Sequence, residues 1–170
     1  MSLPQDLLVQ ARMLATIDPC RPKQANLRRA ISGAYYALFH LLATDAARLY
    51  VRDHSGLVTR ITRTINHADI MSVSREFNKR VLPRSFQHVE RPLVISDMLV
   101  KVTKAFISLQ AERHKADYDM GITYTREATL THVEQAETAF AEWAVVKSAD
   151  DARLYHACFS NWDSWNKPPR

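Results

Sequence analysis

Apolar residues recur every three or four positions along almost the whole chain, the spacing of one face of an α-helix. No segment alternates apolar and polar residues as a half-buried strand would. The pattern predicts helices over about residues 4–17, 23–51, 57–80 (bent near 66–67), 93–119 and 126–147, with a short sixth at 150–159. Long helices joined by short breaks favour an all-α fold, an antiparallel bundle of four to five helices.

The breaks between these helices carry their own signals. Asp18-Pro19 ends the first helix, residues 53–56 separate the second from the third, and Pro83 and Pro92 bracket an irregular connection. Gly121 is predicted as a helix C-cap. One domain is expected over residues 1–159, followed by an irregular tail over 160–170. The predicted core contains Leu27, Ile31, Leu38, Val102, Leu109 and Phe140.

Composition narrows the function classes. The chain has 170 residues, of which 46% are apolar and only 3 are glycine, so glycine-rich phosphate loops and dinucleotide folds are disfavoured. Cys20 and Cys158 lack a Cys-x-x-Cys context, and no Glu-x-x-His motif occurs. No metal and no cofactor is predicted. Without a signal peptide or a bilayer-length apolar run, a cytoplasmic protein without membrane association is expected.

The charge balance slightly favours an anionic partner. There are 23 Lys and Arg against 18 Asp and Glu, a net charge of +5. Such an excess concerns association rather than fold, and it modestly raises the expectation of a nucleic-acid or nucleotide partner.

The first informative segment lies within the second predicted helix. Arg29, Gly33, Tyr36 and His40 recur at intervals of four, three and four, so they share one helical stripe beside the core stripe. Neighbouring small residues would let another helix approach closely. The stripe is either the seam of a tightly packed helix pair or part of a ligand-binding site.

The second segment ends the fourth predicted helix. The apolar stripe of that helix continues to Arg113, where a permanently charged group stands in place of an apolar one. Such a group needs a partner, and Asp117 lies one turn further on. Arg113 and Asp117 form either a structural pair, or a site facing a phosphate or RNA with His114 and Tyr118 on the adjacent stripe.

Together the two segments resemble a known family. Residues 34–40 read Ala-Tyr-Tyr-Ala-Leu-Phe-His, and about seventy residues later Arg113 opens an Arg-x-x-x-Asp-Tyr-Asp motif, followed by a helix containing Ala, Phe and Trp. This arrangement resembles a HEPN domain, and most closely the bacterial branch with an Arg-x-x-x-Asp-Tyr signature, over about residues 7–146. The resemblance implies an antiparallel helical bundle, commonly a homodimer. Many members are RNA-cleaving toxins or partners of nucleotidyltransferases in toxin–antitoxin operons, and others bind nucleotides.

The sequence departs from the catalytic motif of that family. The motif is an Arg, four to six residues and then a His, but the positions after Arg113 that would hold the His are Tyr118, Asp119 and Met120. The resemblance therefore implies a binding or interaction module that engages RNA, a nucleotide or a nucleotidyltransferase-type partner without this chemistry. Two alternatives stay open: a metal-independent endoribonuclease using Arg113 with Tyr118 or His114, and a purely structural dimeric bundle.

A homodimer is the expected assembly. Cyclic dimers are the commonest oligomers, and the small-residue face of the second helix together with Trp162 and Trp165 supplies a plausible interface. The two tryptophans are expected to cover an apolar patch on the bundle or on a partner subunit, although they could also stack on bases.

Overall fold

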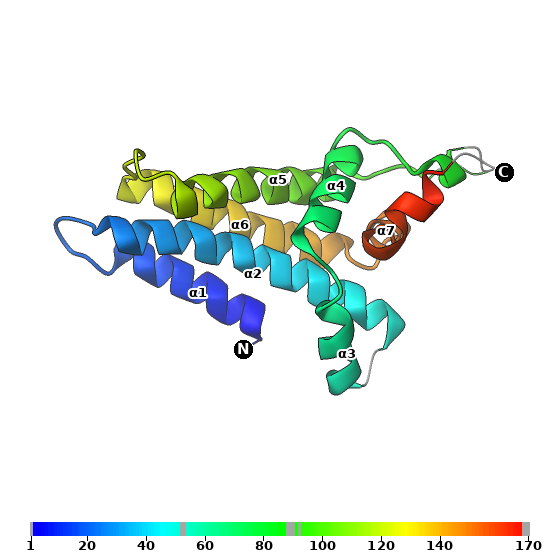
Figure 1. Ribbon diagram of the computed structural model, residues 1–170, viewed down its shortest axis with the longest axis horizontal. Coiled ribbons are helices and arrows are strands. Elements are labelled where there is room, and N and C mark those ends of the chain that lie inside the picture. The colour runs from blue at the N-terminus through cyan, green and yellow to red at the C-terminus, as the bar shows by residue number, and fades with distance from the viewer. Residues whose placement is uncertain (1, 52–53, 88–90, 92, 168–170) are drawn as a thin grey trace. The chain divides into compact units, whose positions relative to one another are not determined.

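The computed structural model describes residues 2–51, 54–87, 91 and 93–167. Every regular element within these residues is a helix, so the predicted all-α class is confirmed (Figure 1). The elements are α1 (Leu3–Thr16), α2 (Gln24–Tyr50), α3 (Ser55–Thr62), α4 (His67–Asn78), the 3-10 helix η1 (Arg84–Phe86), α5 (Asp97–Tyr118), α6 (Arg126–Val146) and α7 (Asp150–Trp165).

The chain divides into two compact units. Unit 1 comprises residues 1–41 and 105–141, and unit 2 comprises residues 42–104 and 142–170. The boundary falls inside α2, α5 and α6, so each of these helices contributes residues to both units. The single domain expected over residues 1–159 stays a prediction.

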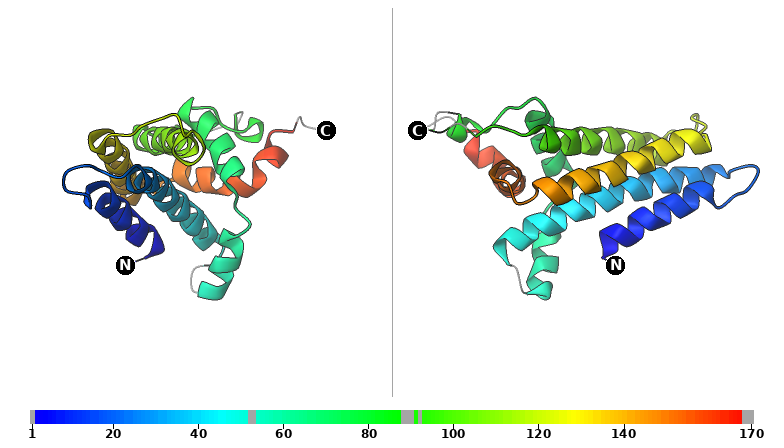
Figure 2. Two further views of the ribbon diagram at one scale, coloured as in Figure 1. Left: turned by 60° about the vertical axis from the view of Figure 1, so that its left-hand side comes forward. Right: turned by 180° about the vertical axis from the view of Figure 1, so that it is seen from behind.

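Unit 1 is an antiparallel arrangement of α1 with parts of α2, α5 and α6 (Figure 2). Arg28 donates a hydrogen bond to the carbonyl of Ala116, and Tyr36 accepts one from Arg113. Residue numbers thus rise along α2 while they fall along the facing part of α5. The antiparallel bundle predicted from the sequence is present in this unit.

Small residues let α1 approach α2 closely. A Cβ atom added at Gly33 would lie 3.4 Å from the Cβ of Ala11 on α1. Ala30, Ala34 and Ala37 are completely buried within the chain. The small-residue face of α2 is therefore packed inside the protein, and the homodimer stays a prediction.

Unit 2 has an aromatic core where α4 packs against α7. Tyr155 is fully buried, with its ring 5.2 Å from that of Phe77 and its hydroxyl 2.7 Å from the hydroxyl of Ser74. The ring of Trp143 lies 6.4 Å from that of Tyr155. These large side chains connect α4, α6 and α7 within the unit.

The helix predicted over residues 57–80 is two helices rather than one bent helix. α3 ends at Thr62 and α4 begins at His67. The side chain of Asn66 accepts a hydrogen bond from the backbone N–H of Asp69 at 2.9 Å, which caps the new helix. Asparagine satisfies a helix N-terminus better than it tolerates a helix interior, and for this reason the pattern breaks there.

The helix predicted to begin at residue 93 begins at Asp97. The hydroxyl of Ser96 accepts a hydrogen bond from the backbone N–H of Leu99 at 3.3 Å, and Asp97 places a negative charge in the first turn. Both features favour a helix start at this point. The predicted break residues Asp53 and Pro92 lie outside the described residues.

Gly121 is not the left-handed C-cap predicted from the sequence, because no described glycine has a positive φ. Instead, the guanidinium of Arg28 donates to the carbonyls of Ala116, Asp119 and Ile122 at 2.8, 2.9 and 2.5 Å. The Asp119 side chain also accepts a hydrogen bond from the N–H of Gly121 at 2.9 Å. A side chain from α2 therefore satisfies carbonyls at the end of α5 that a glycine cap would otherwise serve.

The tail predicted to be irregular from Ser160 is helical as far as Trp165, because α7 is longer than expected. The ring of Trp165 lies 5.0 Å from that of Phe86 in η1, and its carbonyl accepts a hydrogen bond from Ser85 at 2.8 Å. These contacts give the last turns of α7 a surface to pack against. Residues 168–170 lie outside the described part of the chain.

Five of the six predicted core residues are buried, namely Leu27, Ile31, Leu38, Val102 and Leu109. Phe140 is only partly buried. No helix in the described residues combines the length and apolar character needed to cross a bilayer.

The close packing of α1 on α2 leads to a test at Gly33. A glycine inside a helix costs about 0.5–1 kcal/mol relative to alanine, and the added methyl group would meet Ala11 at van der Waals distance. We expect Gly33→Ala to raise the free energy of unfolding by about 0.5–1 kcal/mol in urea denaturation. Gly33→Leu should lower it, because α1 leaves no space for the longer side chain. A clear loss of stability in Gly33→Ala would contradict this packing.

Candidate functional site

A groove in unit 1 lies between α1 and α2. It has a volume of about 420 Å³ and is lined by Leu3, Leu7, Gln10, Leu14, Arg29, Ser32, Gly33, Tyr36 and His40. All four members of the predicted stripe on α2 are among them, and α1 supplies the opposite wall. The helical spacing therefore brings Arg29, Tyr36 and His40 to one concave surface, as the sequence hypothesis requires.

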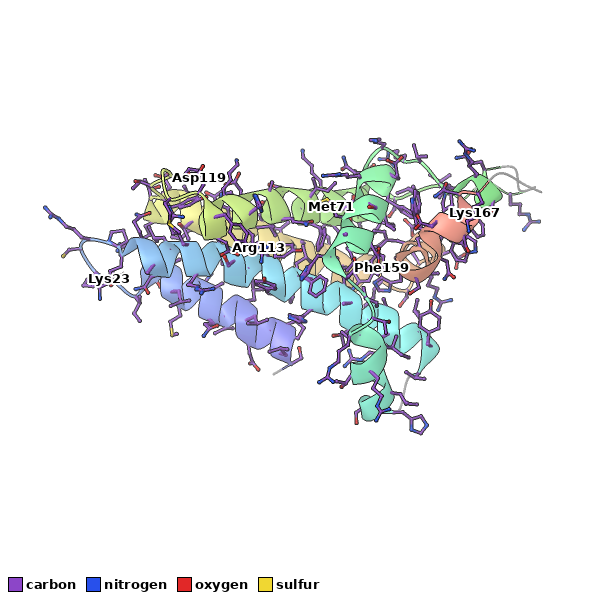
Figure 3. The ribbon with its side chains drawn as sticks, viewed as in Figure 1. Lys23, Met71, Arg113, Asp119, Phe159 and Lys167 are labelled. Carbon is purple, nitrogen blue, oxygen red and sulfur yellow. The ribbon has the colours of Figure 1, made fainter. Side chains whose placement is uncertain are left out.

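Arg113 on α5 is not in the lining but contacts one of its members, Tyr36 (Figure 3 labels Arg113). Its Nη2 donates a hydrogen bond to the hydroxyl of Tyr36 at 2.6 Å, and its guanidinium lies 5.2 Å from the centre of the Tyr36 ring. The guanidinium is also 5.9 Å from the ring of Tyr35, which is almost completely buried. The cation thus rests against aromatic faces that stabilise it.

Asp117 balances the charge of Arg113. Its Oδ2 lies 2.7 Å from Nε of Arg113, an ion pair rather than a well-directed hydrogen bond, and its Oδ1 accepts a hydrogen bond from Ser32 at 2.5 Å. Burial by itself lowers the pKa of the Arg113 guanidinium, but Tyr36 and Asp117 raise it more, so the net pKa lies above its usual value. Arg113 therefore stays charged and paired.

These contacts join the two sequence motifs into one cluster, made of Arg113 and Asp117 on α5 with Ser32 and Tyr36 on α2. Ser32 and Tyr35 were not among the predicted site residues, although Tyr35 belongs to the 34–40 segment that carries the family resemblance. Ser32 lies one helical turn before Tyr36, a spacing that places it on the same side of α2. The buried ring of Tyr35 had no distinguishing signal, because an aromatic residue beside a core stripe reads as packing.

His40 is a half-buried histidine at the end of the groove. Burial lowers the pKa of its imidazole below the usual 6.5, so the ring is neutral at pH 7. Its ring stacks on that of Tyr36 with 6.4 Å between centroids. Arg113 and His40 thus contact the same tyrosine, and the neutral imidazole offers one donor and one acceptor.

Arg29 provides positive charge to the groove. Its side chain is exposed and forms no ion pair with another residue in the described part of the chain. An unpaired guanidinium beside apolar walls suits bidentate contact with a phosphate or carboxylate.

Tyr118 and His114 lie apart from the groove. The ring of Tyr118 is 5.8 Å from the guanidinium of Arg113 but is 64% exposed, and the ring of His114 lies 5.0 Å from that of Tyr118. His114 is exposed, as expected for a neighbour of Arg113 pointing about 100° away. The set Arg113, Tyr118 and His114, considered for catalysis from the sequence, meets around the exposed Tyr118, and none of the three lines the groove.

Among the described residues, no three His, Cys, Asp or Glu side chains are grouped so that they could hold a metal ion. Comparison of the chain with protein-family models, curated proteins and solved structures finds no match. The likeness to HEPN domains therefore stays an expectation from the residues.

The cluster makes a quantitative prediction for Arg113 and Asp117, whose side chains are 23% and 19% exposed. We expect Arg113→Met and Asp117→Asn each to destabilise the protein, with a coupling energy of about 1–2 kcal/mol in a double-mutant cycle. The matched control is the Lys115–Glu112 pair on the same helix. Its Nζ and Oε1 atoms lie 2.7 Å apart, and the Lys115 side chain is half exposed. A surface pair of this kind should give about 0.5 kcal/mol or less. Equal coupling in the two cycles would show that the Arg113 pair has no special structural role.

Proposed function

We propose that this protein is a HEPN-like binding module whose unit 1 groove holds a phosphate-bearing ligand, an RNA or a nucleotide, without cleaving it. The observation that carries the proposal is the convergence of the two motifs. Arg29, Tyr36 and His40 line one groove, while Arg113, paired with Asp117, donates a hydrogen bond to Tyr36. In this proposal Arg29 supplies the charge, His40 and Gln10 the neutral polar contacts, and Arg113 is a positioning residue.

The state of Arg113 supports binding rather than cleavage. Cleaving RNA without a metal requires groups that give and accept protons near a charged group that stabilises the phosphate. Here the charge of Arg113 is already balanced by Asp117, and its Nη2 is used by Tyr36. His114, the histidine beside it in sequence, contacts Tyr118 instead.

An exposed apolar surface supports the proposal of a homodimer. Val9 and Met13 on α1 are 57% and 52% exposed, and they line a groove of about 520 Å³ with Leu8, Arg12 and Glu137. Arg12 and Glu137 lie 2.6 Å apart and carry opposite charges. A second copy related by a two-fold axis would therefore meet both an apolar surface like its own and complementary charges.

The groove proposal is tested with a short single-stranded RNA and with AMP as probes. We expect Arg29→Ala to weaken binding by at least about tenfold, because a charge-assisted contact is lost, and to reduce the salt dependence of binding by about one ion. Arg21→Ala is the matched control, since Arg21 is also exposed in unit 1 but does not line the groove. The affinity of the Arg21→Ala variant for both probes should stay near that of the unmodified protein.

Two outcomes would contradict the groove proposal. If the unmodified protein binds neither probe, the purely structural interpretation replaces it. If the protein cleaves RNA in the presence of a metal chelator, and His40→Ala abolishes cleavage, the protein is an endoribonuclease in which His40 replaces the histidine missing after Arg113.

The dimer proposal is tested by sedimentation at micromolar concentrations. We expect the unmodified protein to be a dimer, and Val9→Asp and Met13→Asp to be monomers, because a charge buried at an apolar interface is unfavourable. Val145→Asp is the control, since Val145 is 67% exposed on α6 outside this groove. A monomeric unmodified protein would contradict the proposal and leave the α1 surface to a different partner, such as a nucleotidyltransferase-type protein.

A further inference from the structure

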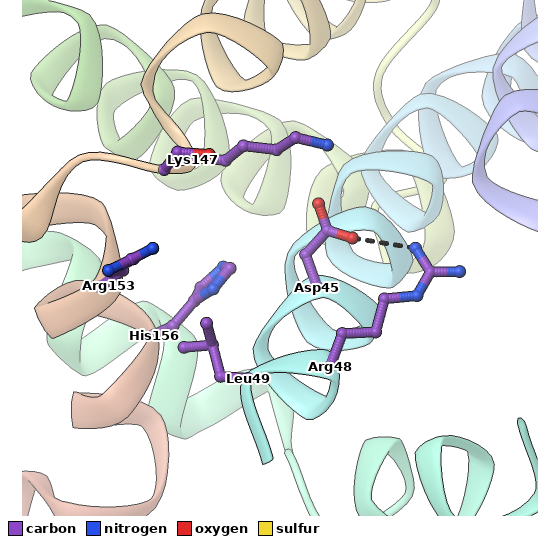
Figure 4. Close-up of a pocket in the computed structure, with 7 residues that line it drawn as sticks. Asp45, Arg48, Leu49, Lys147, Arg153 and His156 are labelled. Atoms are coloured by element: carbon purple, nitrogen blue, oxygen red, sulfur yellow. Dashed lines mark hydrogen bonds and ion pairs between the residues drawn. The ribbon is translucent and has the colours of Figure 1, made fainter. Parts of the chain in front are cut away.

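A second pocket lies wholly within unit 2, where the last turns of α2 meet the α6–α7 connection and the start of α7 (Figure 4). Its volume is about 370 Å³, and its lining consists of Asp45, Arg48, Leu49, Lys147, Ser148, Arg153 and His156. This size falls in the range of pockets that bind small molecules, roughly 300–1,000 Å³. No part of the sequence analysis pointed to it.

The lining is positively charged. Arg48, Lys147 and Arg153 face a single carboxylate, Asp45. That carboxylate is already satisfied, because Oδ1 lies 3.1 Å from Arg48 and Oδ2 accepts a hydrogen bond from the indole N–H of Trp143 at 3.0 Å. Lys147 and Arg153 form no side-chain ion pair within the described residues. Lys147 and Arg153 can therefore bind an anion in the pocket.

Helix dipoles do not account for all of these cations. Arg48 lies in the last turn of α2 and Lys147 directly follows the last residue of α6, so both stand next to a helix C-terminus, where positive charge is favoured. Arg153 lies in the first turn of α7, where the helix end is itself positive and a cation is unfavourable. Asp150 and Asp151 lie in the same turn, but neither forms an ion pair with Arg153 within the described residues. Both oxygens of Asp151 accept backbone hydrogen bonds, from Ser96 and Ala152 at 2.9 Å. Arg153 therefore lines the pocket without a salt-bridge partner.

His156 provides an independent sign of a ligand. It is 2% exposed, and its Nε2 has no hydrogen-bond partner although the atom is buried. The ring packs against Trp143 at 4.5 Å, and Figure 4 shows the imidazole extending from α7 into the pocket. Burial lowers the pKa of His156 to about 3, so the ring is neutral at physiological pH. Buried polar atoms are nearly always satisfied, so an unsatisfied Nε2 that lines a pocket calls for a hydrogen-bond partner there, which is an acceptor in the tautomer that carries the proton on Nε2.

We propose that this pocket binds the phosphate group of a small phosphorylated molecule. Lys147 and Arg153 contribute charge, Arg48 is held in place by Asp45, and neutral His156 donates a hydrogen bond from Nε2. A phosphate dianion has several acceptor oxygens and a double charge, which match donors arriving from α2, α6 and α7 better than a planar carboxylate does. This site is independent of the unit 1 groove and of the function proposed for it.

The test is calorimetric titration with inorganic phosphate and with AMP at constant ionic strength, with acetate as the competing anion. We expect saturable binding of phosphate and AMP but not of acetate. Lys147→Gln and Arg153→Gln should each weaken phosphate binding by at least about tenfold. Lys104→Gln is the matched control, because Lys104 is an exposed lysine of unit 2 on α5 outside the lining. In the Arg29→Ala background, which removes the charge of the unit 1 groove, tighter binding of AMP than of phosphate would identify a nucleotide-like ligand of the unit 2 pocket. Equal binding would indicate recognition of the phosphate alone.

A second measurement follows His156 itself. In ¹⁵N-labelled protein, phosphate should shift the Nε2 resonance of His156, and Arg153→Gln should abolish the shift. His156→Phe removes the donor while keeping a ring in the aromatic core, and it should lose phosphate affinity with an unchanged helical spectrum. If this variant does not fold, the resonance of the unmodified protein decides the question.

Several results would overturn the proposal. These are an absence of phosphate binding, equal binding of acetate, equal weakening by Lys104→Gln, or an Nε2 resonance that does not respond to phosphate. To separate the two sites, the same titrations are carried out in the Arg29→Ala background, in which the unit 1 groove has lost its charge. Phosphate binding that disappears in this background would place the anion in unit 1 instead.

Discussion

The ion pair between Arg113 and Asp117 is the interaction on which the arrangement of unit 1 depends. A guanidinium in the apolar stripe of α5 loses water when the helix packs, so its charge must be matched by fixed partners. Asp117 provides the opposite charge one turn away, and Tyr36 provides an acceptor on α2. Polar contacts are directional, whereas apolar contacts are not. The hydrogen bonds of this pair with Tyr36 and Ser32 on α2 therefore determine the register in which α2 and α5 meet more strictly than the surrounding alanines and leucines could.

A second set of hydrogen bonds joins α2 to α5 at the C-terminal end of α5. Arg28 reaches across from α2 and donates to the carbonyls of Ala116, Asp119 and Ile122. Its guanidinium also lies 5.6 Å from the ring of Tyr124. Two arginines on opposing helices thus each bridge α2 and α5, and between them they orient the stripe that carries Arg29, Tyr36 and His40. These hydrogen bonds fix the α2 wall of the groove, because α2 cannot rotate about its axis without breaking the bonds of Arg28 and Arg113.

The two candidate sites differ in how their charges are compensated. In unit 1 the cation on α5 is paired inside the protein, and the exposed Arg29 carries the charge offered to a ligand. In unit 2 the carboxylate of Asp45 is satisfied internally, and the cations Lys147 and Arg153 stay available. Both sites contain a histidine whose pKa is lowered by burial, His40 in one and His156 in the other. Neutral imidazoles next to cations suit hydrogen bonding to an anion better than proton donation.

The sequence by itself determined the helical class, the extents of α1, α2 and α6, and the membership of the Arg29–His40 stripe. All of these follow from spacing within one helix, which repeats every 3.6 residues whatever the helix packs against. The sequence also indicated that Arg113, which stands in an apolar stripe, needs a partner of opposite charge. Asp117 was the candidate because it lies one helical turn further on. The sequence predicted a bend near Asn66 where the structure has a full break, and it placed the start of α5 before Ser96. In both places a capping side chain ends or begins a helix, and such a cap does not interrupt the apolar period that the prediction follows.

Only the tertiary structure decided which residues from separate helices meet. It showed that Tyr36 and Ser32 receive Arg113 and Asp117, that Arg28 replaces a glycine cap at the end of α5, and that α1 covers the small-residue face of α2 at Gly33. It also brought Arg48, Lys147 and Arg153 around His156. In sequence these four residues are scattered over more than a hundred positions without a motif. A pocket built from the ends of three helices has no period to detect, since its members become neighbours only when the chain folds.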